Sequence, residues 1–160
     1  DFNYLSPAHV IEELVGARCA GANLLMNVGP TAEGAVPDYE RAALARVGDW
    51  IEMNGGGDGP LYLGRPTSIM GEGRDRALAL GDDLYVFVFD LTATANSQVG
   101  VRARVEGPRS FEGVTARFQK ATWTDNGQEV AFSQEGGRLV LETTKYPYGT
   151  NTVVRVARLQ

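Results

Sequence analysis

The residues best suited to chemistry lie near the C-terminus, in the stretch KYPYGTN at 145–151. Tyr146 and Tyr148 place two aromatic rings beside polar loop residues, with Trp123 and Asn126 as candidate neighbours. The apolar face of a pyranose packs on such rings while polar groups fix its hydroxyls, so the pattern indicates a carbohydrate site. The pattern also fits a loop whose tyrosines cover the end of a hydrophobic core. Alanine at Tyr146 or Tyr148 weakens glycan binding under the first interpretation and lowers the melting temperature under the second.

A second stretch, GANLLMNVGPT at 21–31, predicts an element buried among others. Leu24–Val28 form an apolar run bounded by glycines, and Asn23 and Asn27 share one parity along it. A strand that is apolar on both faces is typical of a parallel sheet covered by helices. Gly29 and Pro30 end this strand, because proline cannot donate to a ladder and glycine permits a turn.

Composition excludes several classes of partner. The chain has 160 residues, a net charge of −5, one cysteine and one histidine. An acidic chain lacks the basic face that nucleic acid or an anionic membrane requires, so we expect neither partner. No apolar run approaches the roughly 18 residues of a membrane helix. Cys19 cannot form an internal disulfide or a cysteine metal cluster, and His9 alone excludes a multi-histidine metal site, so we expect no metal.

Helical patterns flank the stretch at 21–31. Ser6 and Pro7 begin the first helix as N-cap and first helical residue, and Gly21 ends it. Pro37 and Asp38 begin the second helix, whose acidic first turn suits the helix dipole. Its apolar stripe is formed by Leu44, Val47 and Ile51, with Trp50 beside it, and Asn54-Gly55 ends it. Helix, strand, loop and helix together are one unit of an α/β fold.

Beyond the glycine-rich stretch at 54–60 the pattern changes from helical to alternating. Glycine and proline at this density mark a hinge or a tight corner. Turn signals at Asp82-Asp83, Asn126-Gly127 and Gly136-Gly137 separate short apolar runs, which suggests an antiparallel sandwich of about seven or eight strands. The expected strands are Ala77–Leu80, Leu84–Leu91, Val99–Val105, Val114–Phe118, Glu129–Ser133, Arg138–Thr144 and Thr152–Leu159. The second of these is expected to be central, because Tyr85, Phe87 and Phe89 alternate with Val86 and Val88.

Residues 6–55 resemble the end of the catalytic domain of the α-L-fucosidases of glycoside hydrolase family 29. The resemblance rests on Asn23–Thr31, Glu33-Gly34, Val36-Pro37 and the segment Gly48–Gly55 that contains Trp50. It covers roughly a third of the chain, and the order of helix, strand, helix and later sandwich also agrees with the family. The residues at 56–63 depart from the family pattern.

This resemblance implies a fold class and an organisation. The chain is expected to be an α+β fragment, in which a helix–strand–helix remnant of a (β/α)8-like barrel precedes the antiparallel β-sandwich. The expected boundaries are 1–55 for the barrel segment, 56–66 for a Gly/Pro-rich linker and 67–160 for the sandwich. Residues 1–5 are expected to continue from an upstream part of the protein.

The resemblance also implies an activity for the parent protein. Retaining fucosidases use an aspartate nucleophile and a separate acid/base carboxyl group, about 5 Å apart. In the family both lie upstream of the matched motif, so this chain is expected to contain no catalytic residue and to be inactive alone. The parent is expected to hydrolyse terminal α-L-fucose from fucosylated glycans and to need no cofactor, since this hydrolysis requires only carboxylates and water. The alternative hypothesis is that the sandwich is a carbohydrate-binding module.

Two residues of the matched motif are candidate substrate contacts. Asn27 at the strand end is placed to hydrogen-bond a sugar in the barrel mouth, or to hold neighbouring backbone as a buried amide. Glu33 follows the strand on the face where barrel active sites form, or is a turn residue before Gly34.

An isolated barrel strand has two unpaired edges and apolar faces, which favour aggregation or new pairing. We therefore expect the helix–strand–helix unit to pack on the sandwich or to associate with a second copy. The sequence leaves the compartment open, and secreted and cytoplasmic locations are both compatible with it.

Overall fold

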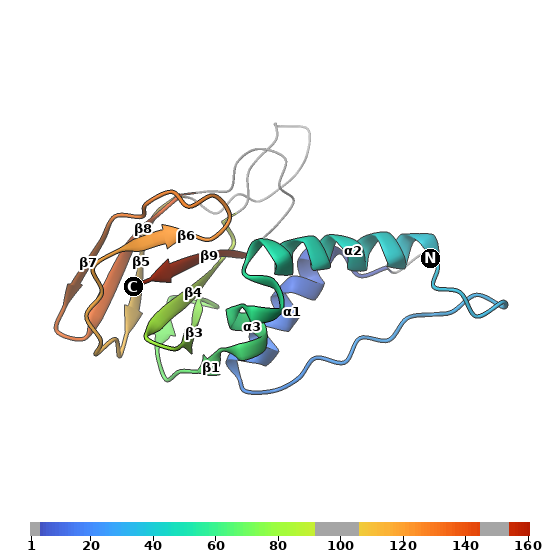
Figure 1. The fold of residues 1–160 in the computed structure, drawn as a ribbon, viewed down its shortest axis with the longest axis horizontal. Helices are drawn as coiled ribbons and strands as arrows, with labels where there is room; N and C mark the ends of the chain where they lie inside the picture. The colour runs from blue at the N-terminus through green and yellow to red at the C-terminus, as the bar shows by residue number, and fades with distance from the viewer. Residues whose placement is uncertain (1–3, 92–105, 145–153) are drawn as a thin grey trace.

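The computed structural model describes residues 4–91, 106–144 and 154–160. The expected strand Val99–Val105 lies outside these residues. A layer of helices stands at one end of the molecule and two β-sheets form the other (Figure 1). The α+β class and the antiparallel sheets predicted from the sequence are confirmed.

Both long helices begin and end where the sequence predicts. Helix α1 covers Pro7–Cys19, and its N-cap Ser6 accepts a hydrogen bond from the His9 backbone at 3.2 Å. Gly21 follows it at φ 76°, a left-handed conformation that favours glycine. Helix α2 covers Asp38–Met53, and Gly55 follows it at φ 106°.

The nine strands of the described chain form two antiparallel sheets. The five-stranded sheet has the order β1-β3-β4-β9-β6, and the four-stranded sheet has the order β2-β5-β8-β7. Their bounds are Arg65–Pro66 (β1), Met70–Gly71 (β2), Arg76–Leu80 (β3), Asp83–Phe89 (β4), Gly107–Glu112 (β5), Ala121–Trp123 (β6), Phe132–Glu135 (β7), Arg138–Thr143 (β8) and Val154–Leu159 (β9). The β7–β8 hairpin turns through Gly136 and Gly137, both at positive φ, which is the type I′ geometry that matches strand twist.

Strand β4 is central and buried on both sides, as its alternation predicts. Val86 and Val88 face the sandwich core, which the two sheets enclose. Phe87 and Phe89 face a second core, which lies between the five-stranded sheet and the helices. The helices supply Val10, Ile11, Val15, Val47, Trp50 and Leu61 to this second core.

The segment between α2 and the sandwich is a compact corner. It forms a 3-10 helix, η1, over Gly56–Asp58 and a single helical turn, α3, over Pro60–Leu63. Leu61 is buried, and Gly59 has no room for a side chain because a Cβ would lie 2.7 Å from the Asn54 carbonyl oxygen. The glycines therefore permit close packing of the backbone here.

Two strand predictions in the sandwich are wrong. Val114–Phe118 is not a strand, because Gly113 at φ 84° ends β5 and the Gln134 side chain then bonds the Phe118 backbone at 2.9 Å. Glu129–Ser133 is displaced, since β7 starts at Phe132 and Glu129 forms only an isolated bridge to Thr122. The sequence prediction also missed β1, β2, β5 and β6.

The predicted strand Leu24–Val28 is also wrong in this structure. Residues 22–30 run along the helices outside any sheet, and Leu25 is 83% exposed. A parallel strand is stable only beside partner strands, and the described chain provides none here. The helices pack on the sandwich as expected, whereas this segment does not.

Candidate functional site

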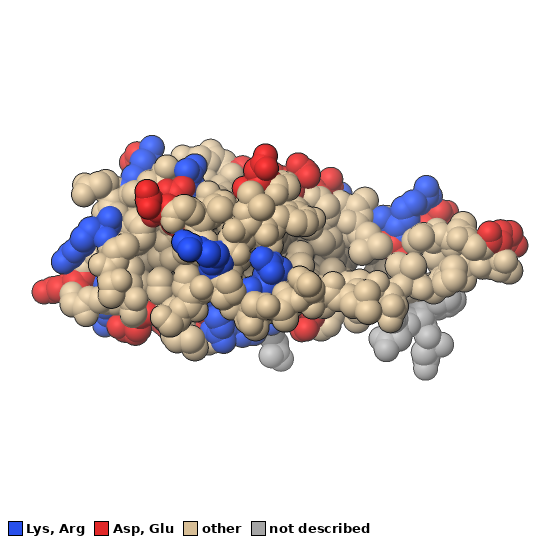
Figure 2. All heavy atoms as spheres, turned by 60° about the horizontal axis from the view of Figure 1, so that its bottom comes forward, with Lys and Arg blue, Asp and Glu red and all other residues tan. Residues whose placement is uncertain are grey.

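The side of the helical layer that faces away from the sheets is the candidate site. Figure 1 shows α1 and α2 side by side with their N-termini at the same end of the molecule. Residues 22–30 cross below them toward that end and lead into a projecting loop, which returns to the start of α2. Figure 2, with this side turned forward, shows few charged side chains along the stretch that leads to the loop. We call this side the outer face of the helical layer.

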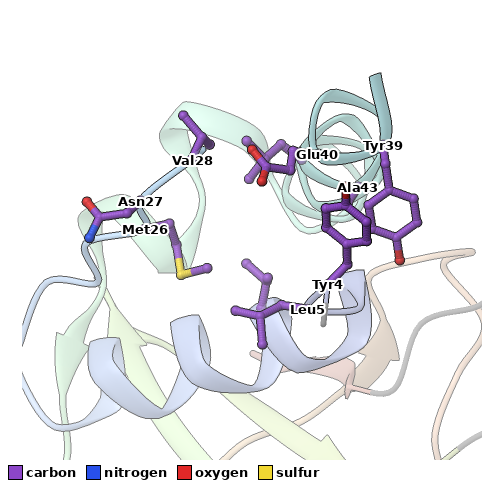
Figure 3. A pocket seen from close by; sticks show the side chains of 10 residues that line it. Tyr4, Leu5, Met26, Asn27, Val28, Tyr39, Glu40 and Ala43 are labelled. Atoms are coloured by element: carbon purple, nitrogen blue, oxygen red, sulfur yellow. The ribbon is translucent and has the colours of Figure 1, made fainter. Parts of the chain in front are cut away.

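The side chains of the crossing segment alternate, although it pairs with no strand. Met26 packs against the second core on the helix side. Leu25 and Asn27 are exposed, and Asn27 points away from the helices (Figure 3). Asn23 and Asn27, which the sequence places on one side of the predicted strand, are both exposed, and no described residue covers them.

The loop after the segment is fixed to α2 and closed on itself. The Gly29 backbone N–H donates to both oxygens of the Glu40 carboxylate, at 3.1 and 3.4 Å. Thr31 and Ala35 exchange backbone and side-chain hydrogen bonds across the turn, at 2.8 and 3.3 Å. Glu33 is exposed in this turn. The loop thus presents a carboxylate to solvent from a hydrogen-bonded turn.

A hollow of about 260 Å³ lies at the N-terminal ends of α1 and α2 (Figure 3). The rings of Tyr4 and Tyr39 stack beside it, with centroids 4.4 Å apart and planes tilted by 35°. As whole residues, Tyr4 is 43% exposed and Tyr39 is 49% exposed. We call this the tyrosine hollow; it is lined by Tyr4, Leu5, Val10, Met26, Asn27, Val28, Tyr39, Glu40, Ala43 and Leu44.

A second hollow, of about 380 Å³, lies at the C-terminal ends of the same helices. Its walls include Leu14, Leu24, Ile51 and Arg18. The Arg18 guanidinium donates to the carbonyl oxygens of Leu61 at 2.6 Å and Gly64 at 3.4 Å, so its charge stabilises the end of α3. Asn23 and Tyr62 also line this hollow, so its wall combines apolar and polar side chains.

The sequence-predicted site residues are not brought together. Asn27 and Glu33 both lie on the outer face, Asn27 beside the tyrosine hollow and Glu33 in the loop beyond it. Tyr146 and Tyr148 lie outside the described residues, so the carbohydrate site predicted for their loop stays a prediction.

Trp123, proposed as a neighbour of that loop, is a core residue. It is 1% exposed, its indole N–H donates to the Thr144 hydroxyl at 3.1 Å, and the Arg155 guanidinium lies 4.1 Å from its ring centroid. A ring buried in this way cannot stack on a sugar, although its bond to Thr144 places it beside the residue that precedes the stretch 145–151. Asn126 is exposed and bonds Gln128 through its side chain.

The two buried carboxylates are structural. Asp75 is fully buried and accepts from the Phe89 backbone at 2.8 Å and from Arg109 at 3.1 Å. Burial raises the pKa of Asp75 from 3.8 to about 6, against the opposing effects of these two donors. Asp125 pairs through both oxygens with buried Arg155, at 2.9 and 3.1 Å. Neither carboxylate reaches a hollow, and the described ranges contain no cluster of metal-ligating side chains.

Cys19 and His9 have no part in the outer face. Cys19 is half-buried against the second core, and burial raises the pKa of its thiol to about 12. A thiol with this pKa stays protonated and unreactive at neutral pH. His9 is exposed in the first turn of α1.

Sequence reasoning missed the tyrosine pair and Arg18. Tyr4 precedes α1 and Tyr39 stands in the first turn of α2, 35 positions later, so no local spacing connects them. The sequence does show that each tyrosine lies at the start of a predicted helix, and this shared position could have indicated that the two rings meet. In the described part of the chain, no helix is both long enough and apolar enough to span a bilayer.

Comparison with known proteins finds relatives of the helical layer and the segment that crosses it. The family model for α-L-fucosidase matches residues 1–56. The chain is 38% identical over 53 residues to plasma α-L-fucosidase of Rattus norvegicus, covering 33% of this chain and 12% of the relative. It is 26% identical over 102 residues to an α-L-fucosidase of Branchiostoma floridae, covering 62% and 22%.

Solved structures match over the whole chain. α-L-fucosidase isoenzyme 1 from Paenibacillus thiaminolyticus has a TM-score of 0.75 and 25% identity, covering 100% of this chain and 35% of that one. A Bacteroides thetaiotaomicron α-L-fucosidase of family GH29, trapped as a covalent intermediate, has a TM-score of 0.73 at 18% identity, covering 99% and 33%. The second match shows the fold alone. The resemblance to α-L-fucosidases is confirmed, and the chain spans about a third of the solved structures and less than a quarter of these two curated relatives.

Proposed function

Since this chain is related to the α-L-fucosidases, we propose that it is the C-terminal region of a retaining α-L-fucosidase that hydrolyses terminal α-L-fucose from glycans. The rest of the catalytic barrel would precede residue 1 and cover the outer face of the helical layer. The sandwich would support the barrel from the opposite side.

One observation carries this proposal: the helical layer is apolar on both of its sides. Ile11, Val15 and Trp50 are buried against the sheet. Leu14 and Ile51, on the same two helices, pack only partly against this core and also line an open hollow on the outer face. An apolar surface of this kind marks an interaction site. Because the first solved structure contains this fold within 35% of its length, the remaining part is the natural candidate to cover it.

In the complete protein, residues 23–28 would become a barrel strand. The segment is already extended and alternates, with Met26 toward the helices and Asn27 away from them. Only the neighbouring parallel strands are missing, and a parallel sheet is stable when helices cover it. The boundaries 1–55, 56–66 and 67–160 fit this arrangement and form part of the proposal.

The two carboxyl groups of a retaining mechanism would lie in the missing part. They must stand about 5 Å apart across the glycosidic bond and reach the sugar. The buried acids Asp75 and Asp125 are tied to arginines inside the sandwich. No described residue is therefore assigned as a catalytic carboxylate, and the isolated chain is expected to be inactive.

Asn27 and Glu33 would face the substrate side. Barrel active sites form at the C-terminal ends of the strands, in the loops that lead to the helices. Asn27 stands near the C-terminal end of the crossing segment with its amide directed away from the helices. Glu33 lies in the loop that follows. Both are proposed to hydrogen-bond hydroxyls of a fucosylated glycan.

The sandwich would hold the helices of the barrel in position. The Trp50 indole donates to the Val154 carbonyl at 2.9 Å, inside the second core. The Thr124 hydroxyl donates to the Asn54 side chain at 2.5 Å, which connects the end of α2 to β6. These bonds join the helical layer to the sheet over positions that lie 70 to 104 residues apart.

The test begins with the coding sequence upstream of Asp1. We expect about 300 further residues of alternating strand and helix, enough for the rest of a barrel. The protein that includes them should hydrolyse an aryl α-L-fucoside with retention, and the 160-residue chain should not. A start codon directly before Asp1, or fucosidase activity of the isolated chain, would contradict the proposal.

A further inference from the structure

We propose that Glu40 is a positioning residue of the active site, whose carboxylate fixes the projecting loop, residues 31–36, so that Glu33 meets the glycan in one orientation. This inference rests on the proposed function, in which Glu33 contacts the substrate. It adds the residue that holds this contact in place.

Glu40 bonds to the crossing segment because its usual partner within the helix is absent. It is the third residue of α2, whose N-cap is Pro37. A glutamate at this position commonly bonds back to the N–H of the N-cap residue, which completes a capping box. Proline has no N–H, so this bond cannot form. The carboxylate instead accepts the Gly29 N–H with both oxygens, at 3.1 and 3.4 Å, and Figure 3 shows it turned toward the crossing segment at Val28.

The bond to Gly29 lies where the crossing segment ends and the projecting loop begins. Pro30 follows, and its ring fixes one of the two backbone dihedrals between Gly29 and the loop. The other end of the loop leads directly into α2. Glu40 therefore ties the entry of the loop to the helix that already holds its exit.

The projecting loop is itself closed by hydrogen bonds. The Thr31 N–H donates to the Ala35 carbonyl at 2.8 Å, and the Ala35 N–H donates to the Thr31 hydroxyl at 3.3 Å. The Gly34 N–H donates to the Thr31 carbonyl at 2.9 Å. Glu33 lies inside this turn and is exposed. A turn that is closed in this way moves as one unit, so fixing its entry also fixes the position of Glu33.

The loop lies on the side where the proposed function places the substrate. It follows the C-terminal end of the crossing segment, and it extends past the N-terminal ends of the helices, beyond the outer face (Figure 1). Barrel active sites form in loops of this kind. A contact presented by a loop is useful to an enzyme only when its geometry is held by surrounding bonds. The bond between Glu40 and Gly29 supplies this restraint.

Two substitutions separate the reach of the Glu40 side chain from its charge. Glu40→Gln keeps the length and an oxygen that can accept the Gly29 N–H. Glu40→Asp keeps the charge, which suits the helix dipole, but is one methylene shorter and should not reach. Asp38→Ala is the matched control, because Asp38 is a carboxylate of the same helical turn that pairs with Arg41 at 2.6 Å.

The first measurement follows the Gly29 amide of the 160-residue chain by water-exchange NMR at neutral pH. Glu40→Ala and Glu40→Asp should raise the exchange rate of this amide about fivefold, the loss of one hydrogen bond that water can reach. Glu40→Gln should raise the rate less, and Asp38→Ala should leave it unchanged. An unchanged rate in Glu40→Ala would overturn the anchor.

The second measurement is the kinetics of the complete protein with fucosyllactose, or with 4-nitrophenyl α-L-fucoside if the wild type hydrolyses only that substrate. Glu40→Ala should raise KM about fivefold and leave kcat unchanged, because a sugar contact present in both the bound and the transition state is uniform binding. A variant that is merely less stable would contain less active enzyme, which lowers the apparent kcat and leaves KM unchanged. Glu40→Gln should restore most of the wild-type KM, and Glu40→Asp should not.

A double-mutant cycle shows whether Glu40 acts through Glu33. Glu33→Ala alone should raise KM by a similar factor, and adding Glu40→Ala to it should change KM by less than about twofold. The proposal is overturned if the two factors multiply, if either single variant leaves KM unchanged, or if only kcat falls.

Failure of the proposed function gives a different result. If the complete wild-type protein hydrolyses neither substrate, the proposed function fails, and the role of Glu40 in an active site fails with it. If the complete protein is active and the Gly29 amide does not respond to Glu40→Ala, only the anchor fails.

Discussion

On the sheet side of the helical layer Ile11, Val15 and Trp50 have no exposed surface, whereas on the outer face Leu25 is 83% exposed. The first side is completed by β4 and β9, which bring their own apolar side chains and hydrogen-bond partners. The second side carries a similar apolar surface, and the described chain leaves it open. Sequence composition alone does not distinguish the two sides, because leucine, isoleucine and valine occur on both. What distinguishes them is whether the partner lies within the same 160 residues.

The completed side should be the most sensitive to substitution. Trp50→Ala should lower the free energy of unfolding by about 3–5 kcal/mol, since it removes a fully buried ring and leaves a cavity. Denaturant unfolding followed by circular dichroism measures this value. Trp50→Phe, which keeps most of the ring and loses the bond to Val154, is the control and should cost less. A loss below about 1 kcal/mol for the alanine variant would mean that the helices do not depend on the sheet.

The sandwich should show a pH dependence centred on Asp75. Its pKa in the folded chain is raised to about 6 from 3.8, because burial penalises the charged form. The protonated form therefore favours the folded state, so this contribution is complete below pH 3.8 and is lost as pH rises through 6. It amounts to about 3 kcal/mol.

The measurement is the free energy of unfolding of the wild type minus that of Asp75→Asn, followed from pH 3.5 to pH 7. The subtraction removes groups that both proteins share, including Glu72, whose pKa is lowered by its hydrogen bonds to Ser110. Arg109 pairs with the Asp75 carboxylate, Arg76 donates to the Asp75 backbone carbonyl, and the charge of Asp90 acts on Asp75. A difference that rises or stays constant with pH would contradict the assignment.

A smaller effect is expected at the start of α1. Ser6→Ala removes the oxygen that accepts from the His9 backbone and should cost about 1 kcal/mol. Ser6→Asp restores an acceptor and should recover most of the loss. Equal stability of the alanine variant and the wild type would show that α1 is held by its contacts with the sheet alone.

The smallest effect on stability is expected on the outer face, and it can be compared directly with a substitution on the sheet side. Leu25→Ala should change the stability of the isolated chain by less than about 0.5 kcal/mol, because the side chain is already exposed. The matched variant Ile11→Ala, on the sheet side, should cost about 2–5 kcal/mol. Thermal unfolding of the two variants gives the contrast directly. A large loss for Leu25→Ala would mean that the outer face is covered in solution, for example by a second copy.

The sequence predicted those elements whose start, end or burial is determined by neighbouring residues in the chain. Ser6, Pro7 and Gly21 bound α1, and the alternation of β4 indicates its burial on both sides. The helical stripe of α2 was predicted less well, because Leu44 lines an outer hollow and Ile51 both lines a hollow and packs partly against the second core. Val47 and Trp50 are buried in that core. A helix that lies between two apolar layers carries apolar residues on two sides, and the helical period alone does not show which side faces which layer.

Other elements depended on contacts that no local pattern encodes. Strand β5, GPRSFE, contains glycine, proline and a buried arginine, and it is a strand because β8 and β2 flank it. Leu24–Val28 shows the reverse case, since its pattern is that of a strand and its partners are absent from the described residues. The tyrosine hollow could not be predicted for a similar reason, because its two rings come from separate helices.

The most direct test of the central claim is hydrogen exchange of the amides of residues 23–28. In the described structure these amides form no backbone hydrogen bond. Mass spectrometry of peptides that cover 22–30 would compare the 160-residue chain with the complete protein. We predict rapid exchange in the isolated chain and strong protection in the complete protein, where neighbouring strands would accept the hydrogen bonds. Equally rapid exchange in both would contradict the claim that the upstream part completes the outer face.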